Sequence, residues 1–235
     1  MGYLRLNHNS RLFLDPTYPF LDNSYFNGGA EWAEFYGDAT KDIPPNMPEP
    51  RGKYIDLRLM CDSDHAGDKS TRQLRTGYLI FINMALIAWL LKKKPTVESS
   101  VFGAEFAAMK TGMEHLRGLQ YKLRMIGVSL SGPSYIYGEN MSVIHNTRRP
   151  ESTLKKNNNS ICYHALREAV AMGECLTMHI PTKDNLSEMM TKVLYGSKKR
   201  GIIEGLMYGV FDSHNPIDKE GTTVSRKKQK RSGRQ

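Results

Sequence analysis

Three strand-like segments in a row, followed by one long amphipathic helix, constrain the fold of this chain more than any other feature. Apolar and polar residues alternate from Ile55 to Cys61, which is typical of a strand with one buried face. Further strands are predicted at 76–82 and 86–91. From 105 to 126, apolar residues recur every three or four positions and predict a helix. Three strands that follow one another directly favour an antiparallel meander.

Shorter elements continue the pattern towards the C-terminus. In chain order, we expect a strand at 133–137, helices at 140–146 and 160–172, a strand at 175–180 and a helix at 185–194. Because the two later strands are reached through helices, they can join the sheet in parallel. The sequence therefore predicts an α/β fold in which helices flank a five-stranded mixed sheet.

Composition divides the chain into three parts. Residues 1–53 are rich in Pro, Asn, Asp and Tyr, so we expect loops and a linker, with one helical turn around Trp32 and Phe35. The main domain is expected at 54–212. Residues 213–235 form a polar, basic tail that is expected to be disordered. No apolar run approaches the roughly eighteen residues of a membrane span.

Charge and cysteine content bear on partners and compartment. The net charge is +9, but more than half of the excess lies in 214–235, so the body is only mildly basic. Three cysteines are too few for a disulfide framework, and no secretory signal is recognised, which favours an intracellular protein. We expect it in the cytoplasm or the nucleus, and the basic run at 226–231 favours the nucleus.

Acidic residues supply the strongest chemical signal. The segment 62–68, Asp-Ser-Asp-His-Ala-Gly-Asp, follows the first strand, although such clusters also occur in solvated turns. Glu105, Glu139 and Glu188 fall at the start of the long helix, at the end of the fourth strand and in the last helix, where each is also compatible with an ordinary surface or helix-end role. In the predicted sheet these ends converge. Converging carboxylates suit two divalent ions about 4 Å apart that activate water for phosphodiester hydrolysis, and Mg²⁺ prefers oxygen ligands.

An ordered series of motifs resembles one known family. The motifs are Asp62 to Asp68, Thr76-Gly77-Tyr78, Trp89, Ser99-Ser100 with Ala104-Glu105-Phe106, Glu139-Asn140 and Thr191-Lys192. In order and spacing they are similar to the ribonuclease H (RNase H) domain that ends copia-type LTR retrotransposon polyproteins. The resemblance runs from about residue 54 to 192. Upstream, Gly2-Tyr3-Leu4 and Leu14-Asp15-Pro16 are similar to the connection that follows the reverse transcriptase.

The resemblance implies an RNase H-like fold, hydrolysis of the RNA strand of RNA–DNA hybrids, and a four-acid site for Mg²⁺ or Mn²⁺. Asp62 and Glu105 match the family residue by residue. The family has Asp at the positions of Glu139 and Glu188. Since a catalytic site holds its groups within about 0.5 Å, an extra methylene at two positions leaves open whether hydrolysis is retained or impaired.

Basic residues form two groups that we expect to contact phosphates, the alternative being a solvated charged face. The first group is Lys92, Lys93 and Lys94, and the second is Arg148, Arg149, Lys155 and Lys156. Phosphate contact by such groups would add a salt-dependent affinity for nucleic acid.

Three functions remain open at this point. The first is an RNase H-type hydrolase, the second is a catalytically inactive nucleic-acid-binding or relic fragment, and the third is a protein-interaction module that uses the Pro-rich leader. The expected partners are an RNA–DNA hybrid and the reverse-transcriptase portion of a polyprotein, whose Tyr-x-Asp-Asp signature does not occur in this chain. No membrane partner is expected.

Overall fold

The computed structural model describes residues 13–21, 32–41, 43–64, 74–93, 100–154, 159–192, 194 and 196–208. Several predictions lie outside these residues. They concern the basic tail at 213–235, the loop residues 65–68 and three basic residues, Lys94, Lys155 and Lys156.

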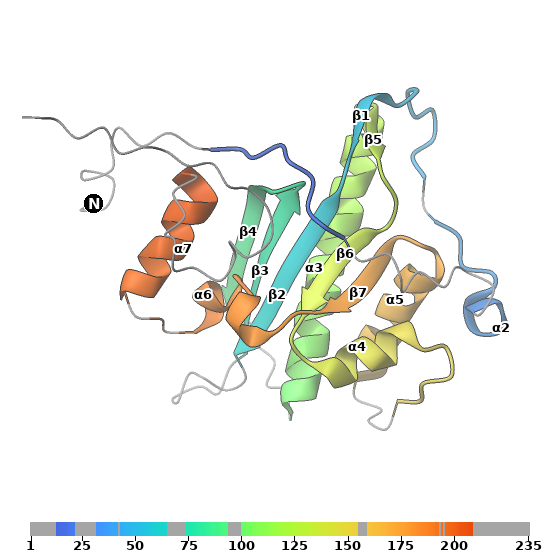
Figure 1. Ribbon diagram of the computed structural model, residues 1–235. Coiled ribbons are helices and arrows are strands. Elements are labelled where there is room, and N and C mark those ends of the chain that lie inside the picture. Colours follow the sequence, from blue (N-terminus) through green and yellow to red (C-terminus); the bar gives the residue numbers. More distant parts are fainter. Residues whose placement is uncertain are drawn as a thin grey trace, which may run out of the picture.

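A five-stranded mixed sheet forms the centre of the molecule, with the strand order β4-β3-β2-β6-β7 (Figure 1). Its strands are β2 (Leu57–Asp64), β3 (Arg75–Ile82), β4 (Ala85–Lys93), β6 (Ser134–Gly138) and β7 (Cys175–His179). The first three pair antiparallel, and β6 and β7 add in parallel. The predicted α/β fold with a five-stranded mixed sheet is therefore confirmed.

Helices cover both faces of the sheet (Figure 1). They are α2 (Ala33–Tyr36), α3 (Val101–Met125), α4 (Met141–Arg148), α5 (Ser160–Ala171), the 3-10 helix η3 (Thr182–Asp184), α6 (Glu188–Thr191) and α7 (Gly196–Tyr208). On one face, Leu59 of β2 packs in a large core with residues of α3 and α5, such as Phe106 and Leu166. On the other, Phe81 of β3 belongs to a second core against which Leu206 of α7 packs. Each face is thus closed by apolar burial, which drives the assembly.

The long helix was predicted closely, and its ends have clear local causes. The Ser100 side chain accepts a hydrogen bond from the Gly103 N–H at 3.2 Å, which satisfies one free donor of the first turn. At the other end Gly127 adopts a φ of +75°, where a side chain would be strained. Both ends of the helix are therefore determined by residues close to them in the sequence.

Two predictions about elements were wrong. The first strand does not run unbroken from 54 to 62, because a separate strand, β1 (Arg51–Ile55), pairs in parallel with β5 (Val128–Leu130). Between them the Asp56 N–H donates to the Asn83 side chain at 2.9 Å, outside the ladder. The helix predicted at 185–194 is also broken. Its first residues form an Asn185-centred turn, in which the Asn185 Oδ1 accepts from the N–H and the hydroxyl of Ser187.

The described N-terminal residues pack on the main domain. The Phe13 N–H donates to the Met207 carbonyl at 2.7 Å, and the Met84 N–H donates to the Thr17 carbonyl at 3.1 Å. The helical turn expected near Trp32 exists as α2, and Trp32 is buried there, whereas Phe35 is half exposed and does not dock. Among the described residues, no helix is long and apolar enough to cross a bilayer.

Candidate active site

The four acids predicted from separate parts of the chain lie together at the carboxyl ends of β2 and β6. Asp62 lies near the end of β2 and Glu139 directly follows β6. These strands are parallel neighbours, with Met60 opposite Tyr137, so their carboxyl ends meet. Figure 1 shows α6, which begins with Glu188, beside this end of β2. Glu105 reaches the site from the first turns of α3.

The ammonium group of Lys192 lies among three of these carboxylates. Its Nζ is 2.6 Å from Glu188 Oε1, 3.7 Å from Glu139 Oε2 and 3.8 Å from Asp62 Oδ1. Glu188 and Lys192 are four residues apart on one helical turn, which brings them together locally. Lys192 therefore acts as an internal cation for the acid cluster.

Neutral side chains fix the orientation of the acids. Thr191 donates its hydroxyl to Asp62 Oδ2. The Asn185 amide donates to Glu139 Oε1 at 2.9 Å and to the Cys61 carbonyl at 3.0 Å, and Thr182 donates to Glu139 Oε2 at 2.9 Å. Glu139 is thus held on both oxygens by groups from the segment before α6. Sequence reasoning missed Asn185, Thr182 and the role of Lys192, although Thr191-Lys192 belonged to the motif series.

Gly77 lets α6 approach the sheet closely. It pairs with Asp62 in the β2–β3 ladder. A Cβ atom at this position would lie 2.7 Å from Met190 Cβ and 2.9 Å from Thr191 Cγ2, closer than real contacts allow. The absence of a side chain at Gly77 therefore permits the contact between Thr191 and Asp62.

Burial shifts the protonation of the cluster. Burial, reinforced by the charge of Asp62, raises the pKa of Glu105 to about 8. Burial also raises the pKa of Asp62, against the hydrogen bond from Thr191 and the charge of Lys192. Burial alone would lower the pKa of Lys192, but its hydrogen bond to Glu188 and the nearby acids raise it overall. The cluster therefore favours a bound positive charge.

The donor set is the kind that Mg²⁺ prefers, because the predicted ligands offer only carboxylate oxygens. Their arrangement is less complete. In the described part of the chain, no group of three or more Asp, Glu, His or Cys side chains is placed to hold one ion. The acids fit a divalent ion by their chemistry, and in this structure they gather around the ammonium of Lys192 instead.

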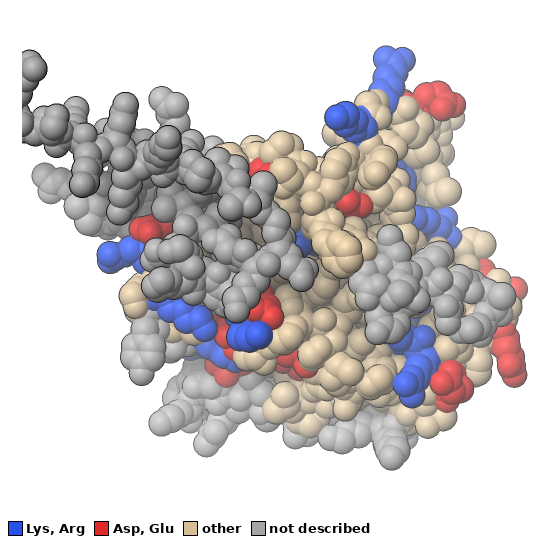
Figure 2. All heavy atoms as spheres, viewed as in Figure 1, with Lys and Arg blue, Asp and Glu red and all other residues tan. Residues whose placement is uncertain are grey.

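The basic residues predicted to bind nucleic acid lie on two separate elements. Lys92 and Lys93 are exposed at the end of β4, whereas Arg148 and Arg149 lie at the end of α4, where Arg149 is exposed. In the sheet, β2 and β6 with their acids lie between β4 and β7, and α4 contacts β7. Figure 2 shows further basic side chains gathered over α7 and beside α6, next to acidic ones.

Comparisons with known proteins point to one group of relatives. No protein-family model matches the chain. The Pol polyproteins of transposons RE1 and RE2 from Arabidopsis thaliana are each 27% identical to it, over 61% and 66% of this chain respectively. The Pol polyprotein of transposon TNT 1-94 from Nicotiana tabacum is 31% identical over 60% of this chain. The chain spans only about a tenth of the length of these polyproteins.

Solved structures with a similar arrangement are RNase H proteins. The N-terminal RNase H domain of Rv2228c from Mycobacterium tuberculosis has a TM-score of 0.45 at 8% identity, over 64% of this chain and 98% of that one. LC11-RNase H1, solved with an RNA/DNA hybrid, has a TM-score of 0.44 at 13% identity, over 55% and 88%. The chain is similar in sequence to one segment of the retrovirus-related Pol polyproteins of transposons.

Proposed function

We propose that this chain is an RNase H-type hydrolase of copia-type retrotransposon origin that cleaves the RNA strand of RNA–DNA hybrids in a metal-dependent reaction. One observation carries the proposal. Acids predicted from four separate segments meet at one edge of the sheet, where three of them lie within 4 Å of a single ammonium group. Such a concentration of carboxylates is costly unless a cation is held there, and the Pol relatives suggest the same chemistry.

Each side chain has a defined part in this proposal. Asp62 and Glu105 would hold Mg²⁺ or Mn²⁺, together with Glu139 and Glu188. The bound ion would supply positive charge at the reacting phosphate and lower the pKa of water. Thr191 orients the carboxylate of Asp62. Lys192 offsets the repulsion between the acids, so that they stay together before any ion binds.

A second candidate function is nucleic-acid binding without cleavage. Its support is that Glu139 already accepts hydrogen bonds from Asn185 and Thr182 and that the ammonium of Lys192 already lies among the acids. Glu139 and Glu188 are one methylene longer than the family's Asp. The carboxylates of this chain would therefore lie away from the positions that catalysis requires. Phosphate contacts would persist and would weaken with salt.

The wider setting is also part of the proposal. The partners would be an RNA–DNA hybrid and the reverse-transcriptase portion of a polyprotein. The division into a connection at 1–53, a domain at 54–212 and a basic tail at 213–235 remains a prediction. The protein would be intracellular, and the basic run at 226–231 would direct it to the nucleus.

A cleavage assay separates the two candidate functions. The full chain is incubated with an end-labelled RNA–DNA hybrid in Mg²⁺ and, separately, in Mn²⁺. It is compared with Asp62→Asn and with the double variant Glu139→Asp, Glu188→Asp, and circular dichroism verifies that each is folded. Cleavage by the unaltered chain that disappears in Asp62→Asn supports the hydrolase.

Two other results have distinct meanings. Cleavage only by the double variant would support the assignment of the site and show that the longer side chains of Glu139 and Glu188 prevent cleavage. No cleavage by any folded variant in either metal would refute the hydrolase and leave nucleic-acid binding without cleavage as the function to test.

A further inference from the structure

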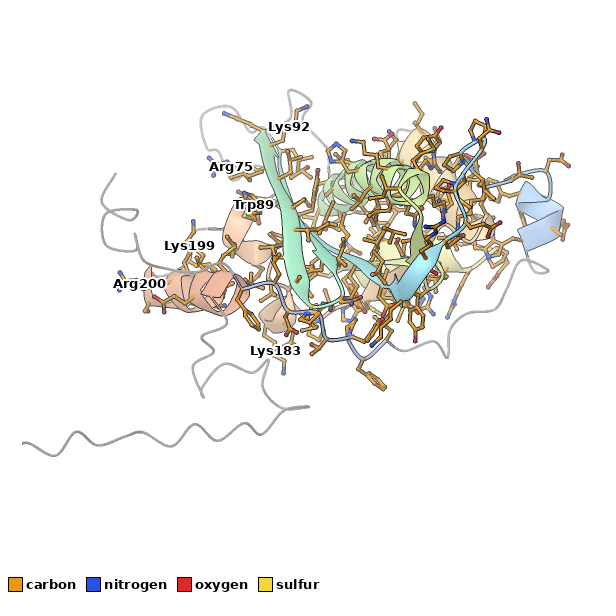
Figure 3. All side chains as sticks on the ribbon, turned by 90° about the horizontal axis from the view of Figure 1, so that it is seen from above. Arg75, Trp89, Lys92, Lys183, Lys199 and Arg200 are labelled. Carbon is orange, nitrogen blue, oxygen red and sulfur yellow. The ribbon has the colours of Figure 1, made fainter. Side chains whose placement is uncertain are left out.

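A second surface lies at the open edge of the sheet, outside the acid cluster. We define this edge surface by Arg75 of β3, Trp89 of β4, and Lys199 and Arg200 of α7. β4 is the outermost strand of the sheet. Figure 3 shows these four side chains on the side of the sheet where α7 lies, with those of α7 directed away from the sheet.

Trp89 is the central feature of the edge surface. It pairs with Leu79 in the β3–β4 ladder, so both side chains point to the face covered by α6 and α7. Leu79 is fully buried, whereas Trp89 is 55% exposed, because the helices cover β3 more completely than its outer neighbour. Among the described residues, the side chain of Trp89 makes no hydrogen bond and no ring contact. A large aromatic ring is therefore presented to solvent on a rigid strand.

Positively charged side chains lie on the same face of the sheet as this ring. No ion pair within the described residues involves Arg75, Lys199 or Arg200. Lys199 and Arg200 are exposed. Glu204 lies one turn from Arg200 on α7, and no ion pair joins the two. The surface thus combines free cations with one exposed indole, which is the combination that contacts phosphates and bases.

We propose that the edge surface binds single-stranded nucleic acid, with Trp89 stacked on an unpaired base and the three cations on flanking phosphates. A base inside a duplex is already stacked on its neighbours and offers no free face to an indole, so the exposed ring selects an unpaired strand. The cations explain the choice of a nucleic acid over an uncharged apolar partner.

The edge surface lies near the acid cluster and is separated from it by α6. Asp62, Gly77 and Leu91 are successive partners across β2, β3 and β4. Two strand spacings separate Asp62 from Leu91, or about 10 Å. Met190 and Thr191 of α6 pack on Gly77 between them. The binding proposed here is therefore independent of the proposed cleavage.

Tryptophan fluorescence measures this binding directly, because the chain has only two tryptophans and Trp32 is buried. The full chain is titrated in EDTA with oligothymidylate and with a blunt RNA–DNA hybrid. We expect oligothymidylate to quench the emission and Trp89→Phe to remove that quenching. Trp89→Ala should weaken binding about fivefold to a hundredfold, the usual range for loss of one base–aromatic stack.

A charge variant tests the phosphate contacts. In the double variant Lys199→Ala, Arg200→Ala, the slope of log K against log salt should fall by about 1.4, or about 0.7 for each lost contact with a single strand. The matched control is Arg51→Ala, Lys53→Ala on β1. It removes the same charge from exposed positions of the separate two-stranded sheet and should leave the slope unchanged.

Three results would overturn the proposal. These are quenching that survives in Trp89→Phe, equal salt slopes for the two double variants, and stronger quenching of Trp89 by the blunt hybrid than by oligothymidylate. Self-association that buries Trp89, without oligonucleotide binding, would point to a protein partner and would also overturn it. Asp62→Asn should abolish cleavage without changing oligothymidylate binding, so failure of the hydrolase and failure of the edge surface give different results.

Discussion

Lys192 decides the electrostatics of the acid cluster at the scale of single residues. Its ammonium lies 2.6 Å from Glu188, in the same four-residue spacing as the Lys110–Glu114 pair, which is also 2.6 Å long. The two pairs differ in their surroundings. The carboxylates that face Lys192 are largely buried, with Glu188 10% and Asp62 1% exposed, whereas Glu114 is 49% exposed. Water therefore screens the carboxylates around Lys192 less than it screens Glu114.

Replacement of Lys192 with Met should destabilise the protein and increase its response to metal. At pH 8 in EDTA, we expect the free energy of unfolding to fall by about 1 to 2 kcal/mol, because buried carboxylates lose a hydrogen-bonded counter-charge. Addition of millimolar Mg²⁺ should stabilise Lys192→Met more than the unaltered chain, as measured by urea denaturation. The control Lys110→Met should change stability by about 0.5 kcal/mol or less. An equal Mg²⁺ response in the two proteins would show that Lys192 is not the internal cation.

Glu105 should make stability depend on pH. Its pKa rises from an ordinary value of 4.5 to about 8 in the folded protein. Between these two pH values the folded state keeps a proton on Glu105 that the unfolded state releases. The contribution of Glu105 to the free energy of unfolding is therefore greatest below pH 4.5, declines as pH rises, and levels off above pH 8. In this range the free energy of unfolding should fall by up to about 1.4 kcal/mol per pH unit. Urea denaturation in EDTA from pH 5 to 9 measures it, and Glu105→Gln should flatten the profile. A slope unchanged by that substitution would contradict the assignment.

At the scale of elements, the contact between β3 and α6 positions the site. Gly77→Val should push α6 away from the sheet, since a Cβ there meets Met190 and Thr191 at less than 3.0 Å. We expect a loss of about 1 to 3 kcal/mol in urea denaturation, which is typical of overpacking. The control Gly118→Ala, with open space around it in α3, should stabilise the chain by about 0.5 to 1 kcal/mol. A neutral Gly77→Val would mean that α6 is not held this closely.

At the scale of the whole molecule, Arg167 joins segments that are far apart in sequence. Its guanidinium donates to the carbonyls of Asn146, Arg149 and Pro150 at 2.6 to 2.8 Å. The same group lies 4.8 Å from the Trp32 ring centroid. A single buried cation therefore fastens α2 of the N-terminal part to the end of α4. Trp32 and α2 are therefore part of the packed structure.

Removal of the N-terminal part should consequently destabilise the domain. A chain that begins at residue 51 loses buried Trp32 and the hydrogen bond between Thr17 and Met84. We expect its free energy of unfolding to fall by about 3 kcal/mol or more. Trp32→Ala in the full chain should account for most of that loss, and both are measured by urea denaturation. Equal stability of the shortened and full chains would show that 54–212 folds independently of the connection.

The sequence by itself determined the elements whose causes are local. The alternation in 55–61 and the apolar period in 105–126 depend on neighbouring residues, so the strands of the sheet and the long helix were predictable. Asp62 was also found this way, because its place at a strand end and its motif are both visible in one segment. The break at Asp56 and the start of the helix at Val101, four residues before the predicted start, were not predicted.

Only the tertiary structure decided which groups share a space. The ammonium of Lys192 beside Asp62 and Glu139 and the hydrogen bond of Asn185 to Glu139 depend on how segments more than 40 residues apart pack together. The break at Asp56 and the pairing of β1 with β5 have the same origin. The exposure of Trp89 depends on the order of the strands, in which β4 is outermost. Periodicity records which face of an element is apolar, but the partner of that face is chosen by burial and electrostatics across the whole fold.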